Sequence, residues 1–356
     1  MEKEEKEKMK KHLLPLVGLL IIATMLLTAC SNGADTAETA ESETTTDAEP
    51  VTVGVFVADS FGDRAFYDIA LDGITLIEDD FGAVTHTYEG KLDYENYKTL
   101  LTNAAKTDDI VFVLGFEAID AMLEVAPQNP DTLYIYLDGV LDSADVVSLG
   151  YKDHEGSFLA GALGGLMTTR TDVEFINEDQ VIGYVGGVDS PVMQRALWGY
   201  EQGLKYVAPE ATLEYIFVGS WVDPAKGKEA TLALMEKGSD INFMYAGLSG
   251  EGGFNAANEG AETWIIGGGA DQRWLGPDNT IASVMKACDV SIHDLTEMYL
   301  NGELNKGDTF NWGVKENGMY LVMSEDLVPA DIVTTINDLQ AKIVNGEITI
   351  SEFRDQ

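Results

Sequence analysis

The stretch VTVGVFVADSFGDRAFYDIALDGITLIED, residues 51–79, decides the fold class of this chain. Its first seven residues, Val51–Val57, form a short apolar run rich in β-branched side chains, which predicts a buried strand. In Ala65–Asp79 the apolar residues instead recur at helical spacing. Strands that are apolar along nearly their whole length are typical of parallel sheets covered by helices on both faces. The stretch therefore predicts the first strand–helix unit of an α/β protein.

The same alternation continues along the chain in two successive sets. The first set adds the expected strands Ile110–Leu114, Leu133–Leu137 and Val146–Leu149 and the expected helices Tyr94–Ala105 and Ala118–Ala126. A Gly/Ala-rich helix is expected around 152–170, and its small residues would allow close packing. The second set has the expected strands Val181–Val185, Leu213–Val218, Ile241–Tyr245 and Thr263–Ile266 and the expected helices Val192–Val207, Lys226–Lys237 and Phe254–Glu259. After it come strands at Thr280–Met285, Thr309–Val314 and Ile348–Ile350 and helices at Val290–Leu300 and Ala330–Val344.

Two such sets predict two doubly wound, Rossmann-like lobes joined by a hinge. We assign residues 51–152 and 280–308 to the first lobe, and residues 153–279 and 309–356 to the second. Ligands of open α/β sheets bind beyond the carboxyl ends of the strands. Two facing lobes therefore predict a ligand cleft between them that closes on a small molecule.

The N-terminus is basic, then strongly apolar over Leu13–Leu27, and ends in Leu27-Thr28-Ala29-Cys30. This order predicts a lipoprotein signal peptide over residues 1–29, with Cys30 as the lipidated N-terminus after cleavage. A single transmembrane anchor is the alternative, but the apolar run is shorter than the roughly 20 residues of a spanning helix. We therefore expect the mature protein to be lipid-anchored on the extracytoplasmic face of the cell membrane.

Residues 30–50 contain Ser, Thr, Ala and acidic residues and no large apolar side chain apart from the cysteine itself. A segment of this composition cannot bury a core, so it predicts a disordered tether. The folded solute-binding part is expected to span residues 51–356.

Composition excludes several classes of partner. Acidic residues outnumber basic ones by 61 to 22, which gives a formal charge of −39. Such a polyanion is repelled by nucleic acid and by anionic membrane surfaces. The chain has two cysteines and four scattered histidines. With Cys30 lipidated, Cys288 has no disulfide partner, and neither a metal site nor a catalytic triad is indicated. We expect no cofactor.

The most specific internal motif is VGSWVDPAKGK, residues 218–228. Asp223 followed by Pro224 is typical of a helix start, because the aspartate caps the helix and proline has a pre-set φ. Trp221 precedes this helix at the carboxyl end of the expected strand. Its side chain would point into the cleft, although ordinary packing between loop and sheet is the alternative.

From Val51 to about Phe353 the chain resembles the basic membrane lipoprotein family, the nucleoside-receptor branch of the type I periplasmic-binding-protein fold. The segments that carry the resemblance are, in chain order, Asp63–Tyr67, Gly183–Tyr200, Val218–Lys228, Ala246–Phe254, Gly267–Gln272, Ser283–Lys286 and Lys342–Ile350. The resemblance implies a monomeric solute-binding protein that captures a purine nucleoside in a closing cleft. It also implies delivery to an ABC importer, whose permease and ATPase subunits are encoded elsewhere.

The resemblance also implies which residues bind the ligand. Phe66 and Trp221 match the two family aromatics that grip the base, and an aromatic face stacks on any purine. Asp271 and Lys286 match positions that hold the ribose hydroxyls, as suits a carboxylate acceptor beside an ammonium donor. Three glycines of the segment 246–254 would let backbone amides approach the ligand; they are Gly247, Gly250 and Gly253.

Four further residues are candidates at the cleft. Asp63 and Asp138 could each accept a hydrogen bond from a base N–H, or could equally cap a turn. Phe116 follows an expected strand and is a candidate for the cleft wall. Tyr67 stands where the family usually has asparagine, and Ala196 stands where many relatives have phenylalanine. Both departures predict a re-shaped pocket.

Other functions were weighed on the same residues. The chain has no G-x-x-x-x-G-K-[ST] motif and no dinucleotide fingerprint, so it is expected neither to hydrolyse nucleotides nor to bind NAD. A receptor or sensor for another small polar ligand, such as a sugar or a signalling molecule, is the main alternative. An exported enzyme such as a nucleoside hydrolase would need convergent carboxylates or a metal, for which the sequence gives no sign.

Overall fold

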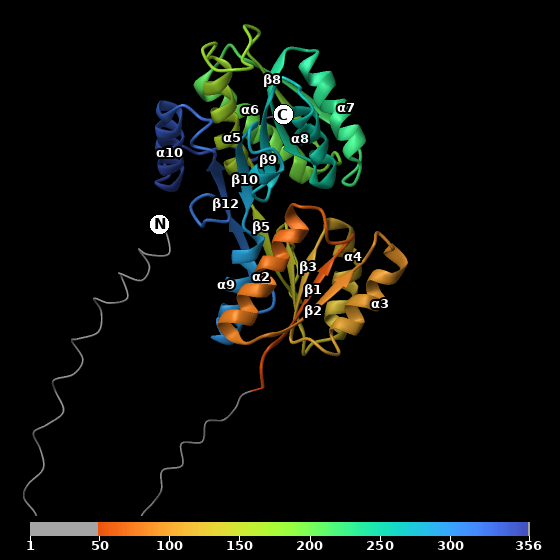
Figure 1. Cartoon of the computed structure of the whole chain (residues 1–356). Coiled ribbons are helices and arrows are strands. Elements are labelled where there is room, and N and C mark those ends of the chain that lie inside the picture. The colour runs from red at the N-terminus through yellow and green to blue at the C-terminus, as the bar shows by residue number, and fades with distance from the viewer. Residues whose placement is uncertain (1–48, 355–356) are drawn as a thin grey trace, which may run out of the picture. The chain divides into compact units, whose positions relative to one another are not determined.

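The computed structural model describes residues 49–354. The expected signal peptide, the lipidation site at Cys30 and nearly all of the expected tether lie outside these residues. The described part contains two α/β lobes, each built on a six-stranded sheet (Figure 1). The expected two doubly wound lobes are therefore confirmed.

The first lobe has strand order β11-β5-β4-β3-β1-β2, with all neighbours parallel. Its strands are β1 (Thr52–Val57), β2 (Val84–Glu89), β3 (Ile110–Leu114), β4 (Leu133–Leu137), β5 (Val146–Tyr151) and β11 (Thr309–Trp312). Its helices are α2 (Phe66–Phe81), α3 (Tyr94–Ala104), α4 (Ile119–Val125) and α9 (Cys288–Leu300), with 3-10 turns at Phe116–Ala118 and Ala126–Gln128.

The second lobe has strand order β12-β10-β9-β8-β6-β7, and only β12 runs antiparallel to its neighbour. Its strands are β6 (Val181–Gly186), β7 (Thr212–Phe217), β8 (Ser239–Tyr245), β9 (Trp264–Gly269), β10 (Thr280–Lys286) and β12 (Met319–Met323). Its helices are α5 (Asp153–Thr168), α6 (Pro191–Val207), α7 (Pro224–Met235), α8 (Glu251–Asn258) and α10 (Ala330–Val344), with 3-10 turns at Gly247–Gly250 and Arg273–Leu275.

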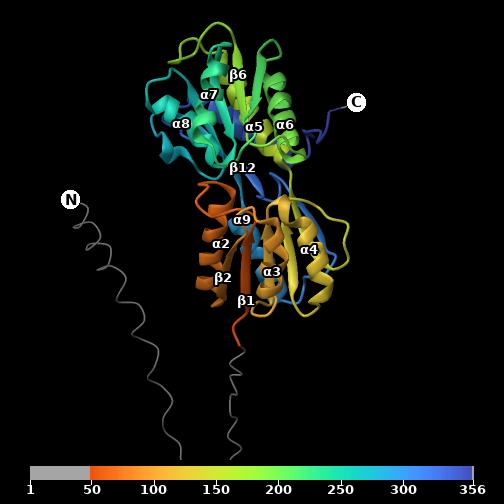
Figure 2. The ribbon, with the colours of Figure 1, turned by 90° about the vertical axis from the view of Figure 1, so that its right-hand side faces the viewer.

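The apolar strands are buried on both faces, as their sequence predicts. In β1, Val53, Val55 and Val57 belong to one core cluster and Phe56 belongs to the other. The second sheet is likewise covered on both sides, with α7 and α8 to the left and α5 and α6 to the right in Figure 2. A strand with two buried faces has no polar side, and this is why period-2 alternation is missing from these runs.

Close packing of α5 on α6 depends on glycine. A Cβ added at Gly161 would lie 1.9 Å from the Tyr200 carbonyl oxygen, and one added at Gly203 would lie 2.0 Å from the Phe158 carbonyl oxygen. No side chain fits in these gaps, so the two helix backbones touch directly. The expected close packing of the Gly/Ala-rich helix is thus present.

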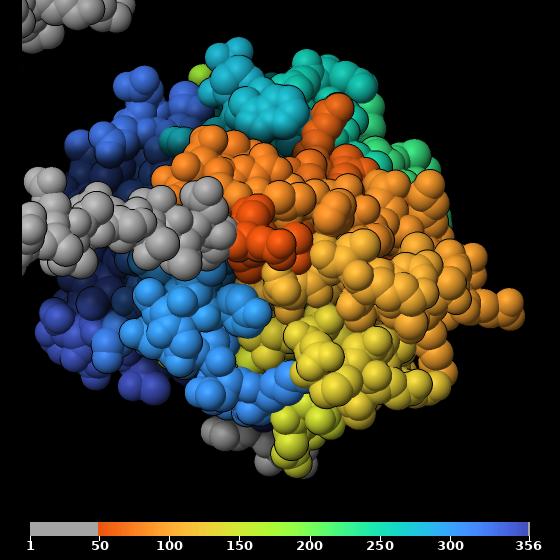
Figure 3. All heavy atoms as spheres, turned by 90° about the horizontal axis from the view of Figure 1, so that it is seen from below, coloured from red at the N-terminus to blue at the C-terminus, as the bar shows by residue number. Residues whose placement is uncertain are grey.

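The predicted lobe boundaries after residue 279 need correction. Strand β10 (Thr280–Lys286) pairs with β9 in the second lobe, although residues 280–308 were assigned to the first. Strand β11 (Thr309–Trp312) pairs with β5 in the first lobe, although residues 309–356 were assigned to the second. Between them α9 packs on α2 in the first lobe, and Figure 3 shows this late segment, in light blue, against the orange and yellow segments. Each late segment thus belongs to the lobe whose sheet or helix it packs against. The local sequence of a segment does not show which lobe that is.

Three elements differ from the sequence prediction in kind. Strands β2 and β12, both at sheet edges, were not expected. Strand β2 (VTHTYE) is mostly polar and is largely exposed or half-exposed. Strand β12 (MYLVM) is apolar throughout, and this strand signal was missed. The expected strand Ile348–Ile350 is not a strand. This segment instead leads into Ser351, whose hydroxyl accepts a hydrogen bond from the Trp198 indole on α6 at 2.8 Å.

Candidate functional site

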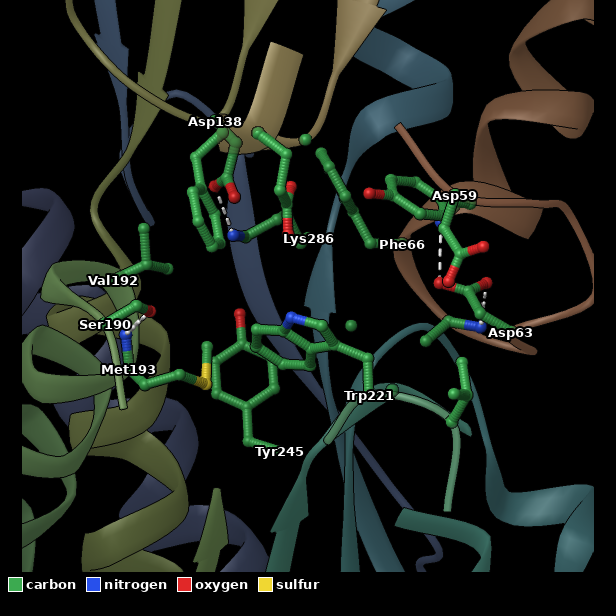
Figure 4. A pocket seen from close by; sticks show the side chains of 18 of the residues that line it. Asp59, Asp63, Phe66, Asp138, Ser190, Val192, Met193, Trp221, Tyr245 and Lys286 are labelled. Carbon is green, nitrogen blue, oxygen red and sulfur yellow. Dashed lines mark hydrogen bonds and ion pairs between the residues drawn. The ribbon is translucent and has the colours of Figure 1, made fainter. Parts of the chain in front are cut away.

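A cleft lies between the two lobes at the carboxyl ends of their strands (Figure 4). It holds about 920 Å³ of space, a figure that includes the part open to solvent. Both lobes line it. The lining residues are Asp59, Ser60, Asp63, Ala65, Phe66, Tyr67, Leu92, Gly115, Phe116, Glu117 and Asp138 from the first lobe, and Ser190, Val192, Met193, Trp221, Val222, Tyr245, Gly247, Gly268, Gly269 and Lys286 from the second.

Phe66 and Trp221 lie on opposite sides of this cleft, as Figure 4 shows. Phe66 is the first residue of α2, and Trp221 lies in the loop between β7 and α7. Asp223 fixes the end of this loop, because its carboxylate accepts a hydrogen bond from the Lys226 amide at 3.1 Å. The expected cap at Asp223 is therefore present, and it holds the loop that carries the tryptophan.

Lys286 forms the charged floor of the cleft. Its ammonium lies 2.6 Å from an Asp138 oxygen and 2.8 Å from an Asp153 oxygen. Asp138 follows β4 of the first lobe, whereas Lys286 ends β10 and Asp153 begins α5 in the second. The Lys286 Nζ also lies 5.1 Å from the centre of the Phe66 ring, within the range of a cation–π contact. This cluster therefore connects the two lobes directly beneath the aromatic pair.

The charges of this cluster support one another. Burial disfavours the ammonium, but the attraction of Asp138 and Asp153 outweighs it and raises the pKa of Lys286 above its usual range. Burial also works against the charged form of Asp153, and here Lys286 and Arg195 outweigh it, so that the pKa of Asp153 is lowered. For Asp138 burial outweighs Lys286, and its pKa is raised. An ammonium has three N–H groups, so one remains for a ligand after the two carboxylates.

Asp63 is a cap rather than a free acceptor. Its two carboxylate oxygens accept hydrogen bonds from the backbone amides of Ala65 at 3.0 Å, Tyr67 at 3.1 Å and Asp68 at 3.1 Å. Asp63 therefore caps the start of a helix, which was one of the two alternatives for this residue. The carboxylate holds the start of α2 and thereby the position of Phe66.

Asp271 and Gly250 are not brought to the cleft. The Asp271 carboxylate pairs with the Arg273 guanidinium through two hydrogen bonds of 2.8 and 2.7 Å. Gly250 and Gly253, which is also absent from the cleft lining, instead face Met244 in the second-lobe core. The lining position near Asp271 is taken by Gly269, whose φ of +95° and closeness to Ala65 leave no room for a side chain. The expected acceptor for the ligand is therefore missing at Asp271, and Asp138 is the carboxylate beside Lys286.

The two departures from the family pattern have different consequences. Tyr67 lines the cleft beside Phe66, with ring centres 6.0 Å apart, so its side chain forms part of the pocket wall. Ala196 is buried inside α6 and is not among the lining residues. The expectation that Ala196 re-shapes the pocket wall is therefore wrong.

Several cleft residues were missed by sequence reasoning. Tyr245 ends β8 and donates a hydrogen bond from its hydroxyl to Asp153 at 2.9 Å. Asp59 and Glu117 line the first-lobe side, and burial together with the charges of Asp59 and Asp138 raises the pKa of Glu117. Each of these residues, Asp153 included, lies at the end of a strand or within three residues after it. Applying the carboxyl-end rule to every strand would have found them.

A second connection between the lobes lies at the rim. The Arg64 guanidinium, on the first lobe, pairs with Glu251 of α8 at 2.9 Å. The Arg64 carbonyl accepts a hydrogen bond from the Gln272 side chain at 3.0 Å. Arg64 also lies 5.5 Å from the ring centre of Trp274. The two lobes are thus in contact on both sides of the aromatic pair.

Within residues 49–354, no group of three or more His, Cys, Asp or Glu side chains is arranged to hold a metal ion. Across the same residues, none of the helices combines the length and the apolar character needed to cross a membrane.

Comparison with known proteins gives the family. The sequence model of the Bmp family, described as "ABC transporter substrate-binding protein PnrA-like", matches residues 50–353. The chain belongs to this family. It is therefore a substrate-binding protein of the ABC-transporter type.

Similar proteins cover nearly the whole chain. A "CD4+ T-cell-stimulating antigen" of Listeria innocua is 28% identical over 97% of this chain and 99% of its own length. "Basic membrane protein D" of Borreliella burgdorferi is 29% identical over 85% of this chain and 88% of its own length. An ABC transporter solute-binding protein of Aeropyrum pernix, known from its crystal structure, has a TM-score of 0.75 at 22% identity and covers 86% of this chain and 94% of its own. That structure supports the type I periplasmic-binding-protein fold.

Proposed function

We propose that this protein captures a nucleoside, with a purine base stacked between Phe66 and Trp221, and delivers it to an ABC importer. One observation carries the proposal: two aromatic side chains, one from each lobe, line opposite sides of a cleft whose wall also holds the buried ion pair of Lys286 and Asp138. Each stacked aromatic contributes on the order of 1–3 kcal/mol per base. A lobe closing over the ligand supplies one ring and one side of the floor, so binding and closure support each other.

The ribose would lie against Lys286 and Asp138. The free N–H of Lys286 donates to a hydroxyl oxygen, and the Asp138 carboxylate accepts from a hydroxyl hydrogen. Asp138 therefore takes the part that sequence reasoning gave to Asp271. In this proposal the protein is a monomeric binding protein and not an enzyme, so it releases no free base when incubated with inosine.

The test is a thermal-shift and calorimetry screen of the purified protein against purine and pyrimidine nucleosides, free bases and sugars. A ligand at a hundredfold excess over Kd stabilises the folded state by about 2.7 kcal/mol, so a nucleoside should raise Tm. Trp221→Ala should weaken nucleoside binding by about 1–3 kcal/mol, or roughly 5- to 150-fold.

Trp198→Ala is the matched control, because Trp198 lies on α6 under the C-terminal segment and is not a cleft residue. It should leave binding unchanged. If Trp221→Ala binds nucleosides as tightly as the unchanged protein, base stacking is refuted.

A receptor for another small polar ligand, such as a sugar or a signalling molecule, is the second candidate. The acidic lining of the first lobe favours it, because Asp59, Glu117 and Asp138 offer several acceptors for hydroxyl groups. A response to a sugar in the same screen, with no response to any nucleoside, would select this candidate.

We also propose that the protein is held at the membrane by lipid on Cys30. Cells fed an alkyne-labelled fatty acid should label the unchanged protein and not Cys30→Ala, and Cys30→Ala should leave the membrane fraction. Cys288→Ala is the control, since this second cysteine is buried in α9. Labelling of Cys30→Ala at the unchanged level would refute lipidation at this residue.

A further inference from the structure

We infer that Gly187 is a positioning residue for the ligand, because it supports the Trp221 ring in the place where a base stacks. This inference rests on the proposed function. Gly187 follows the last residue of β6 directly. A Cβ added at Gly187 would lie 2.2 Å from Cε3 and from Cζ3 of Trp221, and 3.0 Å from Cη2. The indole therefore lies with its six-membered ring on the bare α-carbon of this glycine.

The backbone of Gly187 is held from both sides. Its amide donates a hydrogen bond to the Tyr245 carbonyl at 3.2 Å, and its carbonyl accepts one from the Gly219 amide at 2.9 Å. These bonds continue the sheet on both flanks of β6, with β8 on one side and β7 on the other. Gly187 therefore cannot retreat from an added methyl group without breaking the sheet.

The backbone of Trp221 is fixed as well. Its carbonyl accepts a hydrogen bond from the Ser249 amide at 2.9 Å, and the Ser249 hydroxyl donates to the Ser220 carbonyl at 2.8 Å. A methyl group at Gly187 would thus have to move the indole ring itself. A ring pushed away from Gly187 moves toward the cleft, which Phe66 lines on the opposite side (Figure 4).

The required movement is large compared with the tolerance of stacking. Carbon atoms in contact are about 3.5–4.0 Å apart, whereas the added Cβ would start at 2.2 Å. The ring must therefore shift by more than about 1 Å toward Phe66 or turn out of its plane. Either change closes or tilts the slot for the base. The φ of Gly187 does not require glycine, so the effect of alanine here would be on the ring and not on the backbone.

The neighbouring residue provides a matched control. A Cβ at Gly186 would lie 2.5 Å from Cδ1 and Cε1 of Phe217 and 2.9 Å from Cε1 of Tyr184. Neither of these rings lines the cleft. Gly186→Ala therefore introduces a comparable clash one residue away, against rings that do not line the cleft themselves.

The experiment compares four variants by calorimetry with adenosine and by thermal unfolding: Gly187→Ala, Gly186→Ala, Trp221→Ala and the double variant Gly187→Ala/Trp221→Ala. We expect Gly187→Ala to weaken binding at least tenfold and Gly186→Ala to keep the affinity of the unchanged protein within about twofold. In the double variant, the added methyl group occupies space that the indole has left. Its affinity should therefore equal that of Trp221→Ala.

Two results would overturn the inference: unchanged affinity in Gly187→Ala, or a further tenfold loss when Gly187→Ala is added to Trp221→Ala. If Gly187→Ala does not fold, the double variant decides, because removal of the indole should restore folding. A double variant that also fails to fold would count against the role of the ring.

If the unchanged protein binds no nucleoside, the proposed function fails separately. The position of the ring is then read from indole fluorescence. The contribution of Trp221, obtained by subtracting the Trp221→Ala spectrum, should shift in Gly187→Ala and stay unchanged in Gly186→Ala. No shift in Gly187→Ala would overturn the inference.

Discussion

Two carboxylates are buried in the second lobe, at opposite ends of its sheet, and their surroundings differ. Asp153 lies at the cleft end, where it contacts Lys286 at 2.8 Å and Arg195 at 3.5 Å. Asp240 lies near the start of β8, where its oxygens accept hydrogen bonds from the Thr168 hydroxyl at 2.8 and 3.0 Å. Both side chains are essentially inaccessible to solvent, so burial alone cannot distinguish them.

Their pKa values move in opposite directions. Burial acts to raise both, but at Asp153 the cations outweigh burial and the pKa is lowered. At Asp240 burial raises the pKa to about 7, because hydrogen bonds from Thr168 and Asn177 offset it only in part. The fold therefore keeps a buried negative charge where the cleft needs a fixed ammonium, and tolerates a carboxylate that is easily protonated where no ligand comes.

Removing the Lys286 ammonium should have the largest effect on stability, because it removes the charge that keeps the pKa of Asp153 low. Lys286→Met leaves Asp138 and Asp153 buried without their main partner, and breaking a buried pair in this way costs about 3–5 kcal/mol. Without the ammonium both carboxyl groups should prefer the protonated form. Urea unfolding at pH 7 should show this loss, and nucleoside binding should disappear with it.

The same variant should regain part of its stability at pH 5. A carboxyl group whose folded pKa is raised stabilises the protein at low pH and loses that contribution as the pH rises. An equal loss of stability in Lys286→Met at pH 5 and at pH 7 would show that the buried carboxylates do not depend on Lys286.

Asp240→Asn should have the next largest effect on the free energy of unfolding. At high pH this variant should gain stability, whereas Lys286→Met loses it. In the unchanged protein the contribution of Asp240 is fully present below about pH 4 and is lost as the pH rises through about 7. Asparagine carries no charge at any pH. The variant should therefore be more stable than the unchanged protein at pH 8, by roughly 2–4 kcal/mol, and similar to it at pH 4.

Urea unfolding of both proteins at several pH values measures this difference. A constant difference between pH 4 and pH 8 would mean that Asp240 does not titrate in the folded state within that range.

The smallest effect is expected at the rim, where a third carboxylate is paired near solvent. Arg64 is 47% exposed, so its ion pair with Glu251 is worth about 0–1 kcal/mol. Arg64→Ala should lower the free energy of unfolding by no more than this, and less so at 1 M salt, where exposed charges are screened. Urea midpoints at low and high salt give the measurement. A loss as large as that of Lys286→Met would place the main connection between the lobes at the rim.

The interior of each lobe could be predicted from sequence because its elements carry a strong local signal. Strands Ile110–Leu114 and Leu133–Leu137 and helix Ala330–Val344 have the predicted bounds. The two strands are buried along their whole length, and the helix buries apolar residues at helical spacing on one face. Edge strand β2 carries no such signal, whereas the apolar run of β12 was missed. The lobe to which β10 or β11 belongs depends on the strand that it pairs with, β9 for β10 and β5 for β11. The partner β5 lies far from β11 in the sequence, so local sequence does not reveal this pairing.

The site divides in the same way. Phe66, Trp221 and Lys286 were named through the resemblance to the family, and all three line the cleft. The ion pair of Lys286 with Asp138 could not be predicted, since it joins residues 148 positions apart. Asp271 was misplaced because Arg273, two residues on, binds its carboxylate. A motif gives the position of a residue in the chain, but the side chains around it determine which way its own side chain points.

The chain crosses between the lobes three times within the described residues: after β5, after β10 and after β11. These crossings affect when each lobe can fold during synthesis. The first lobe receives α9 and β11 only from residues 288–312, and the second receives β12 from Met319–Met323. A growing chain that has reached residue 279 has therefore finished neither lobe. Each half waits for the last quarter of the sequence, so the two halves mature together and late, with many contacts between distant residues to be formed at once. A truncation meant to isolate one lobe would leave an open sheet edge.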